Sequence, residues 1–92
     1  MTADEKRTAA IHDFYKVYRE LQKYDNLRLH TRESIYDEAL IEVYRYHGEK
    51  KDERVIRITQ EDAATTYIQA TDQVRSLLQQ AKERRAAERR RA

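Results

Sequence analysis

The stretch that decides the fold is residues 31–59, TRESIYDEALIEVYRYHGEKKDERVIRIT, which holds the only glycine of the chain. Apolar and aromatic side chains recur in its first half at spacings of four and three residues, the period of one helix face. A hydroxyl at Thr31 or Ser34 can cap free amide groups, and Gly48 can adopt the left-handed conformation that closes a helix. The sequence therefore predicts a helix whose buried face is Tyr36, Leu40, Val43 and His47.

Residues 52–59, at the end of this stretch, permit two interpretations. Val55, Ile56 and Ile58 are β-branched and could form a short strand that ends at Thr59. A helix is favoured because the apolar register continues without a break toward the C-terminus. The residues in that register are Ile56, Ala63, Tyr67, Ala70, Val74, Leu77 and Ala81. We therefore expect a third helix that includes them.

The N-terminal third carries the clearest helical pattern, from about Asp4 to Tyr24. Its apolar stripe consists of Ala10, Phe14, Val17, Leu21 and Tyr24. Together these patterns predict an all-α fold of about three helices with short connections. We expect residues 1–81 to form the helical domain and residues 82–92 an extended, charged helical tail, because the apolar stripe ends there.

The composition predicts a modest core. Charged residues make up 39% of the 92 residues, and the mean hydropathy is −1.09. Such a chain buries little apolar surface by itself, so we expect a non-globular packing that a partner completes. No cysteine is present, which excludes disulfides and thiolate zinc sites. The longest apolar runs are three residues, far short of the roughly 20 that cross a bilayer, so any membrane contact is expected to be peripheral.

The sequence predicts no catalytic, cofactor-binding or metal-binding residues. His12, His30 and His47 lie in three separate places, and no nucleophile is accompanied by a glycine-rich elbow. The carboxylates lie on polar faces opposite lysine and arginine, where nothing separates their pKa values into an acid and a base. We therefore expect a non-enzymatic protein with no small-molecule substrate and no cofactor.

Two features indicate binding to other macromolecules. Seven of the eight aromatic residues are tyrosine, more than a short core needs, and tyrosine is common at protein interfaces. Packing inside a helical bundle is the plainer explanation for them. Residues 75–92 contain seven basic and two acidic residues, so this tail could bind phosphates of nucleic acid or lipid. It contains no aromatic residue to stack on a base, so nucleic-acid binding is the alternative rather than the first interpretation.

Two blocks of the sequence resemble subunit 7 of the mitochondrial cytochrome bc1 complex, also called the ubiquinone-binding protein of complex III. The first block runs from Tyr24 through Leu27, Leu29 and the polar stretch 31–34 to Ile35-Tyr36-Asp37-Glu38. The second block comprises residues 44–49 and residues 53–58, which are similar to the arginine-rich segments of that family. The family is helical over the segment that residues 53–58 resemble, so the resemblance implies a helix there too.

The resemblance implies a non-catalytic structural or assembly subunit, peripheral on the matrix side of the mitochondrial inner membrane, that binds cytochrome b and core proteins. Without the resemblance, a cytoplasmic location is expected. The residues that it places at partner contacts are Tyr24, Leu27, Leu29, Ile35, Tyr36, Tyr44, Arg45, Arg54 and Arg57. A second resemblance concerns Val17-Tyr18-Arg19, which is similar to the leucine-tyrosine-arginine motif of small mitochondrial assembly factors.

Overall fold

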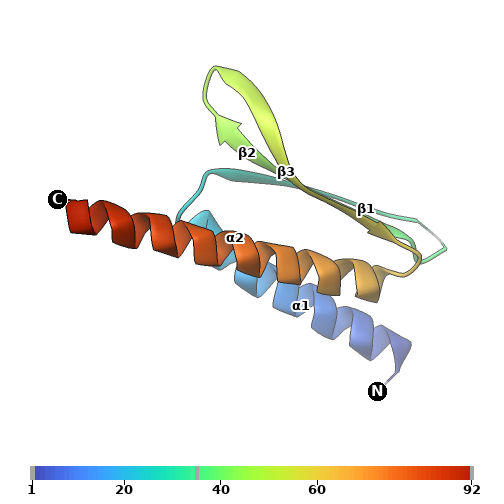
Figure 1. The fold of residues 1–92 in the computed structure, drawn as a ribbon. Helices are drawn as coiled ribbons and strands as arrows, with labels where there is room; N and C mark the ends of the chain where they lie inside the picture. The colour runs from blue at the N-terminus through green and yellow to red at the C-terminus, as the bar shows by residue number, and fades with distance from the viewer. Residues whose placement is uncertain (1, 35, 92) are drawn as a thin grey trace.

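A computed structural model describes residues 2–34 and 36–91 and shows two helices and three strands in the order αβββα (Figure 1). The elements are α1 (Ala3–Gln22), β1 (Leu27–Glu33), β2 (Ala39–His47), β3 (Lys50–Gln60) and α2 (Ala63–Arg91). The strands form one antiparallel sheet in the order β1-β2-β3. The fold is therefore mixed α and β, and the all-α prediction is wrong.

The error lies in residues 27–60, where strands replace the expected second helix and the start of the third. In β2 the buried residues are Ala39, Ile41 and Val43, which alternate with less buried neighbours. This period of two places one set of side chains on one sheet face, whereas a helix would have buried Tyr36, Leu40, Val43 and His47 together. The β-branched side chains at Ile41, Val43, Ile56 and Ile58 favour the same outcome, because they pack well on a pleated surface.

Gly48 ends a strand rather than a helix. His47 pairs with Lys50, so Gly48 and Glu49 form a two-residue hairpin loop between β2 and β3. Gly48 has φ +70°, the positive value that such a loop requires at its first position and that glycine adopts without strain. The residue that was expected to close a helix therefore closes a hairpin, and the hairpin projects away from the helices (Figure 1).

The two helices match the sequence pattern more closely. α1 begins after Thr2, whose hydroxyl accepts the Glu5 N–H at 3.1 Å, and it ends at Gln22, two residues before the expected Tyr24. α2 begins after Asp62, whose carboxylate accepts the Thr65 N–H at 2.8 Å. This hydrogen bond, with a second one that the Thr65 hydroxyl donates to the same carboxylate, holds the pKa of Asp62 below its usual value. The expected tail belongs to α2, which continues as one helix to Arg91.

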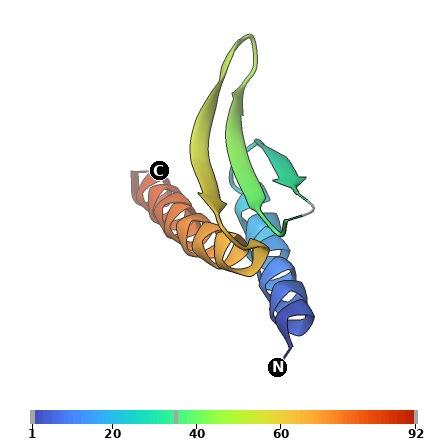
Figure 2. The ribbon, with the colours of Figure 1, turned by 90° about the vertical axis from the view of Figure 1, so that its right-hand side faces the viewer.

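Both helices lie on the same face of the sheet and leave the other face open (Figure 2). They run in the same direction (Figure 1): the middle of α1 meets the start of α2 at Phe14 and Tyr67, and Tyr24, just after α1, meets Arg85 in the second half of α2. Phe14 lies at the centre of the helix pair, with its ring 5.5 Å from that of Tyr67. Helices and sheet share one core, and the expectation that a partner completes the packing stays a prediction.

Cross-strand pairing assigns each strand residue to a face. Leu29 pairs with Val43, which pairs with Ile56, and all three face the helices. The next partner on β3 after Ile56 is Arg54, opposite Tyr44, so Val55 is the extra residue of a β-bulge. Side chains alternate between the two faces of the sheet on each side of Val55, and the extra residue shifts this alternation by one position. Arg54 and Arg57 therefore both lie on the face opposite the helices.

Candidate functional site

The face of the sheet that the helices leave uncovered carries most of the strands' arginines. We call this surface the open face. Its residues are Arg28, His30 and Arg32 of β1, Leu40, Glu42, Tyr44 and Tyr46 of β2, and Arg54, Arg57 and Thr59 of β3. Four arginines and one histidine thus share it with the Glu42 carboxylate and, at its edge, with the Asp52 carboxylate that pairs with Arg28. The middle strand contributes the aromatic rings, and the outer strands contribute the cations.

One cross-strand row places a tyrosine between two arginines. Arg28 of β1 pairs with Tyr44 of β2, and Tyr44 pairs with Arg54 of β3. Neighbouring strands lie about 4.8 Å apart, so the two arginines flank the ring on both sides. The next row consists of His30, the Glu42 carboxylate and Arg57. The open face therefore carries the rings of Tyr44 and Tyr46 and the Glu42 carboxylate along its middle strand, with a cationic margin of arginines on each outer strand.

The ring of Tyr44 is held in place by its neighbours. Its hydroxyl donates to a Glu42 carboxylate oxygen at 2.7 Å, and the His30 ring meets it edge-on at 5.4 Å. The hydrogen bond from Tyr44, with the nearby Arg54 guanidinium, lowers the pKa of Glu42, and the same bond raises the pKa of Tyr44. Glu42 is thus ionised at neutral pH and Tyr44 is neutral, which keeps this hydrogen bond intact.

Tyr46 lies two residues further along β2, where the hairpin begins to project beyond the helices. The Arg28 guanidinium carbon lies 5.0 Å from the centre of its ring, and Arg28 also reaches Asp52 of β3 at 3.7 Å. Tyr46 is 38% exposed, so part of its ring meets solvent. Arg28 and Tyr46 together present a flat, polarisable surface beside Tyr44.

The remaining charges of the open face are unevenly satisfied. The exposed Arg54 lies 3.7 Å from the half-buried Glu42. Arg32 and Arg57 form no ion pair among the described residues and are exposed. These two arginines therefore keep their positive charge available to an anionic ligand.

The residues predicted to contact partners do not form one site. Tyr44, Arg54 and Arg57 lie on the open face, whereas Leu27 is buried in the core and Leu29 packs against it. Tyr36 is 78% exposed in the loop between β1 and β2, where Asp37 has φ +65°. Ile35 lies outside the described residues.

Tyr24 and Arg45, the other two predicted contacts, lie at the end of the core where α1 joins β1. Arg45 and Arg84 approach the Asp25 carboxylate at 3.4 and 3.2 Å, and the Arg85 guanidinium lies 4.2 Å from the Tyr24 ring centre. Asp25 thereby connects a loop, β2 and α2. These contacts stabilise the fold, so Tyr24 and Arg45 are occupied within the chain.

Sequence reasoning missed Arg28, His30, Arg32 and Tyr46. The sequence did contain a signal for the first three. In residues 27–32, the apolar Leu27 and Leu29 alternate with Arg28 and His30. That alternation predicts a strand with an apolar face and a basic face. Tyr46 had no such signal, since its position on the open face depends on the pairing of β2 with both neighbours.

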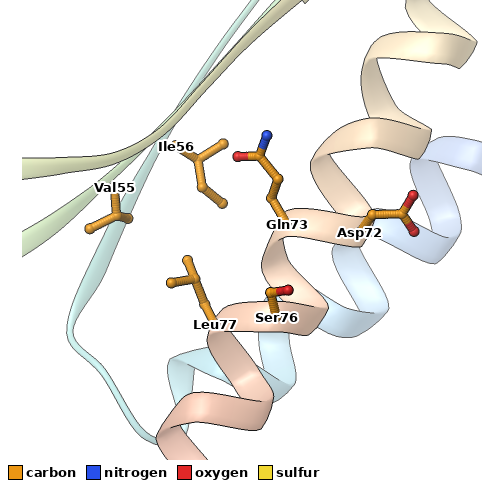
Figure 3. A pocket seen from close by; sticks show the side chains of 6 residues that line it. All are labelled: Val55, Ile56, Asp72, Gln73, Ser76 and Leu77. Atoms are coloured by element: carbon orange, nitrogen blue, oxygen red, sulfur yellow. The ribbon is translucent and has the colours of Figure 1, made fainter.

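A shallow groove lies outside the open face, between β3 and α2 (Figure 3). It encloses about 360 Å³ and is lined by Val55, Ile56, Asp72, Gln73, Ser76 and Leu77. Val55 and Leu77 point into it, whereas the Asp72 carboxylate points away from the strand (Figure 3). The groove therefore offers apolar contact but no paired acid and base.

Within residues 2–34 and 36–91, no group of three or more histidine and carboxylate side chains is placed to hold a metal ion. No helix in the same part of the chain is both long enough and apolar enough to cross a membrane. No family model, curated protein or solved structure matches this chain. The resemblance to the complex III subunit therefore stays a prediction from the sequence.

Proposed function

We propose that this chain is a non-catalytic protein that binds nucleic acid through the open face of its sheet. The observation that carries the proposal is the row of Arg28, Tyr44 and Arg54, in which a fixed aromatic ring lies between two cations. Arginines bind phosphate oxygens, and aromatic rings stack on bases. The two chemistries that nucleic acid requires thus occur on one surface.

The rest of the charge distribution supports the same ligand. Arg32 and Arg57 extend the cationic margins along β1 and β3. The last turns of α2 add Arg89, Arg90 and Arg91, all exposed, which attract a polyanion at long range. The tail was the predicted nucleic-acid contact; in this proposal it assists, and the sheet carries the binding.

The two mitochondrial hypotheses draw no support from the geometry. The complex III family is helical where this chain forms β3, so the role on the matrix side of the inner membrane rests on the sequence resemblance alone. In the assembly-factor hypothesis, the motif tyrosine is Tyr18, which is only 5% exposed and belongs to the core. A buried ring is not available to a partner without unfolding.

Titration of fluorescent oligonucleotides, followed by anisotropy, tests the proposal. We expect the affinity to fall as salt rises, because bound arginines release the counterions of the phosphates. The double variant Arg32→Gln/Arg57→Gln should weaken binding and reduce the slope of log K against log salt by about 0.7–0.9 for each lost contact.

The matched control is Arg19→Gln, which removes an exposed arginine from α1, on the helix side of the molecule. It should leave the affinity and the salt slope nearly unchanged. Equal losses in the control and the double variant would contradict the proposal, as would equally strong competition by poly-glutamate. Absence of binding at low salt would overturn it outright.

A further inference from the structure

We infer that the open face selects an unpaired strand of nucleic acid over a duplex, with bases placed against Tyr44 and against the Arg28–Tyr46 pair. This inference rests on the proposed function and names its substrate class. Three features of the open face support it: the spacing of the rings, the width of the sheet and the fixed position of the aromatic side chains.

The spacing of the two rings suits separated bases. Tyr44 and Tyr46 lie two residues apart on the same strand, which places them about 7 Å apart at the usual rise per residue. Bases of a duplex are stacked about 3.4 Å apart, so both faces of each base are covered. Only a strand whose bases are unstacked can place neighbouring bases on two such rings.

The width of the sheet works against a duplex. The major groove is about 12 Å wide and admits a helix or a two-stranded ribbon. Three strands span about 10 Å between the axes of the outer two, before side chains are added. The central ring of Tyr44 is flanked by Arg28 and Arg54, so it cannot reach base edges at the floor of a groove. An extended strand lying along β2 meets no such obstacle.

The aromatic surface is ordered before any ligand arrives. Tyr44 is fixed by its 2.7 Å hydrogen bond to Glu42 and by the His30 ring. Arg28 lies over Tyr46 and is anchored by Asp52. Guanidinium planes also stack on bases, so a base can stack on Arg28 with Tyr46 beneath it. Preordered side chains lose little entropy on binding, which favours stacking as the source of affinity.

The cationic margins fit the backbone of such a strand. With bases along β2, the phosphates lie over one outer strand, within reach of Arg32 on one side or Arg57 on the other. The projecting hairpin is the part of the molecule that suits a duplex, because it is a two-stranded ribbon. Its tip carries Lys50 and Lys51, and groove binding by this tip is the competing outcome of the test.

The test compares a single-stranded oligonucleotide with the duplex of the same length at one salt concentration, using the full chain. We expect the single strand to bind at least tenfold more tightly. Tyr46→Leu should weaken single-strand binding about fivefold or more, the loss of one stacked base, without changing the salt slope. Tyr44→Leu should have a similar effect.

Tyr36→Leu is the matched control, because Tyr36 is an exposed tyrosine in a loop beyond the strand ends. It should bind like the wild type, and circular dichroism should show that all variants remain folded. An independent readout uses Tyr46→Trp, which introduces the only tryptophan of the chain. Its fluorescence should be quenched by the single strand and not by the duplex.

The outcomes separate the two proposals. Duplex binding as tight as single-strand binding would overturn the selection of unpaired strands and leave the proposed function intact. Unchanged single-strand affinity in both Tyr44→Leu and Tyr46→Leu, or an unquenched indole, would overturn stacking as its basis. Failure of both nucleic acids to bind would overturn the proposed function as well.

Discussion

Tyr67 shows how a single residue connects three elements at one end of the core. It is almost fully buried in α2, and its hydroxyl donates to Glu33 of β1 at 3.4 Å. Glu33 also forms an ion pair with Arg7 of α1. Burial, together with the negative charge of Glu33, raises the pKa of Tyr67 to about 12. The neutral phenol is therefore the form that the fold requires.

The raised pKa predicts a loss of stability in alkali. The unfolded chain releases the phenol proton near pH 10.0, whereas the folded chain holds it to about pH 12. The contribution of Tyr67 to stability is thus complete below pH 10 and disappears as the pH rises toward 12. Urea titrations across this range should show the free energy of unfolding falling, and Tyr67→Phe should make the fall shallower.

Tyr18 is also buried, and burial raises its pKa, so some alkaline sensitivity should remain in Tyr67→Phe. Tyr36→Phe is the control for a tyrosine in water and should follow the wild-type profile. An alkaline profile of Tyr67→Phe that coincides with the wild type would show that this phenol does not couple folding to pH.

At the scale of elements, the sequence predicted the helices well and the sheet poorly. α1 and the core of α2 have long apolar stripes at helical spacing, which leave little choice of structure. The segment 39–47 is short, and its apolar residues fit both the helical spacing of three to four residues and the strand spacing of two. The ambiguity arises because Leu40 and Tyr44, on the open face, are themselves apolar or aromatic. Only the pairing of this segment with β1 and β3 decides which of its residues face the helices. The sequence of one segment does not reveal which strands it pairs with.

The same reasoning limits what could be known of the site. Arg54 and Arg57 are three residues apart. That spacing would place them on the same face of a helix but on opposite faces of a regular strand. The bulge at Val55 places both on one face of the strand. The sequence alone does not reveal a bulge, because the extra residue is defined by the strand opposite. Tyr44, Arg54 and Arg57 were expected to contact a partner, whereas Arg28, His30, Arg32 and Tyr46 beside them on the open face were not.

The hairpin loop provides a test at this scale. A Cβ on Gly48 would meet no atom within 4 Å, so Gly48→Ala adds no clash and changes only the backbone preference at φ +70°. We expect the free energy of unfolding to fall by about 1–2 kcal/mol, the cost of a left-handed conformation for a residue with a Cβ. Glu49→Ala, in the neighbouring loop position, should cost much less, and similar losses in both would argue against a specific role of the glycine.

At each end of the molecule a carboxylate joins separate elements: the partly exposed Glu33 and the largely buried Asp25. Glu33 connects α1, β1 and α2, and Asp25 connects the α1–β1 loop with Arg45 of β2 and Arg84 of α2. Between them lies one continuous core. Because the helices and the sheet share this core, we expect the isolated chain to unfold in a single cooperative thermal transition.

Asp25→Asn tests the contacts that join the α1–β1 loop to Arg45 of β2 and Arg84 of α2. The change removes the charge that two arginines share at a site where Asp25 is only 16% exposed. Its hydrogen bonds to charged partners predict a loss of about 1–3 kcal/mol and a lower melting temperature. Glu20→Gln removes the exposed pair with Lys23 on α1 and should cost less than about 1 kcal/mol. Equal shifts in melting temperature would place the Asp25 contacts among ordinary surface pairs.

The placement of both helices on one side of the sheet has a practical consequence for immobilisation. The start of α1 and the end of α2 lie at opposite ends of the helix layer (Figure 1). A linker attached at either position would hold the molecule by its helices and orient the arginines and tyrosines toward the medium. The chain can thus be mounted on a sensor chip or a bead in two opposite ways, and both mountings leave the open face accessible to an oligonucleotide.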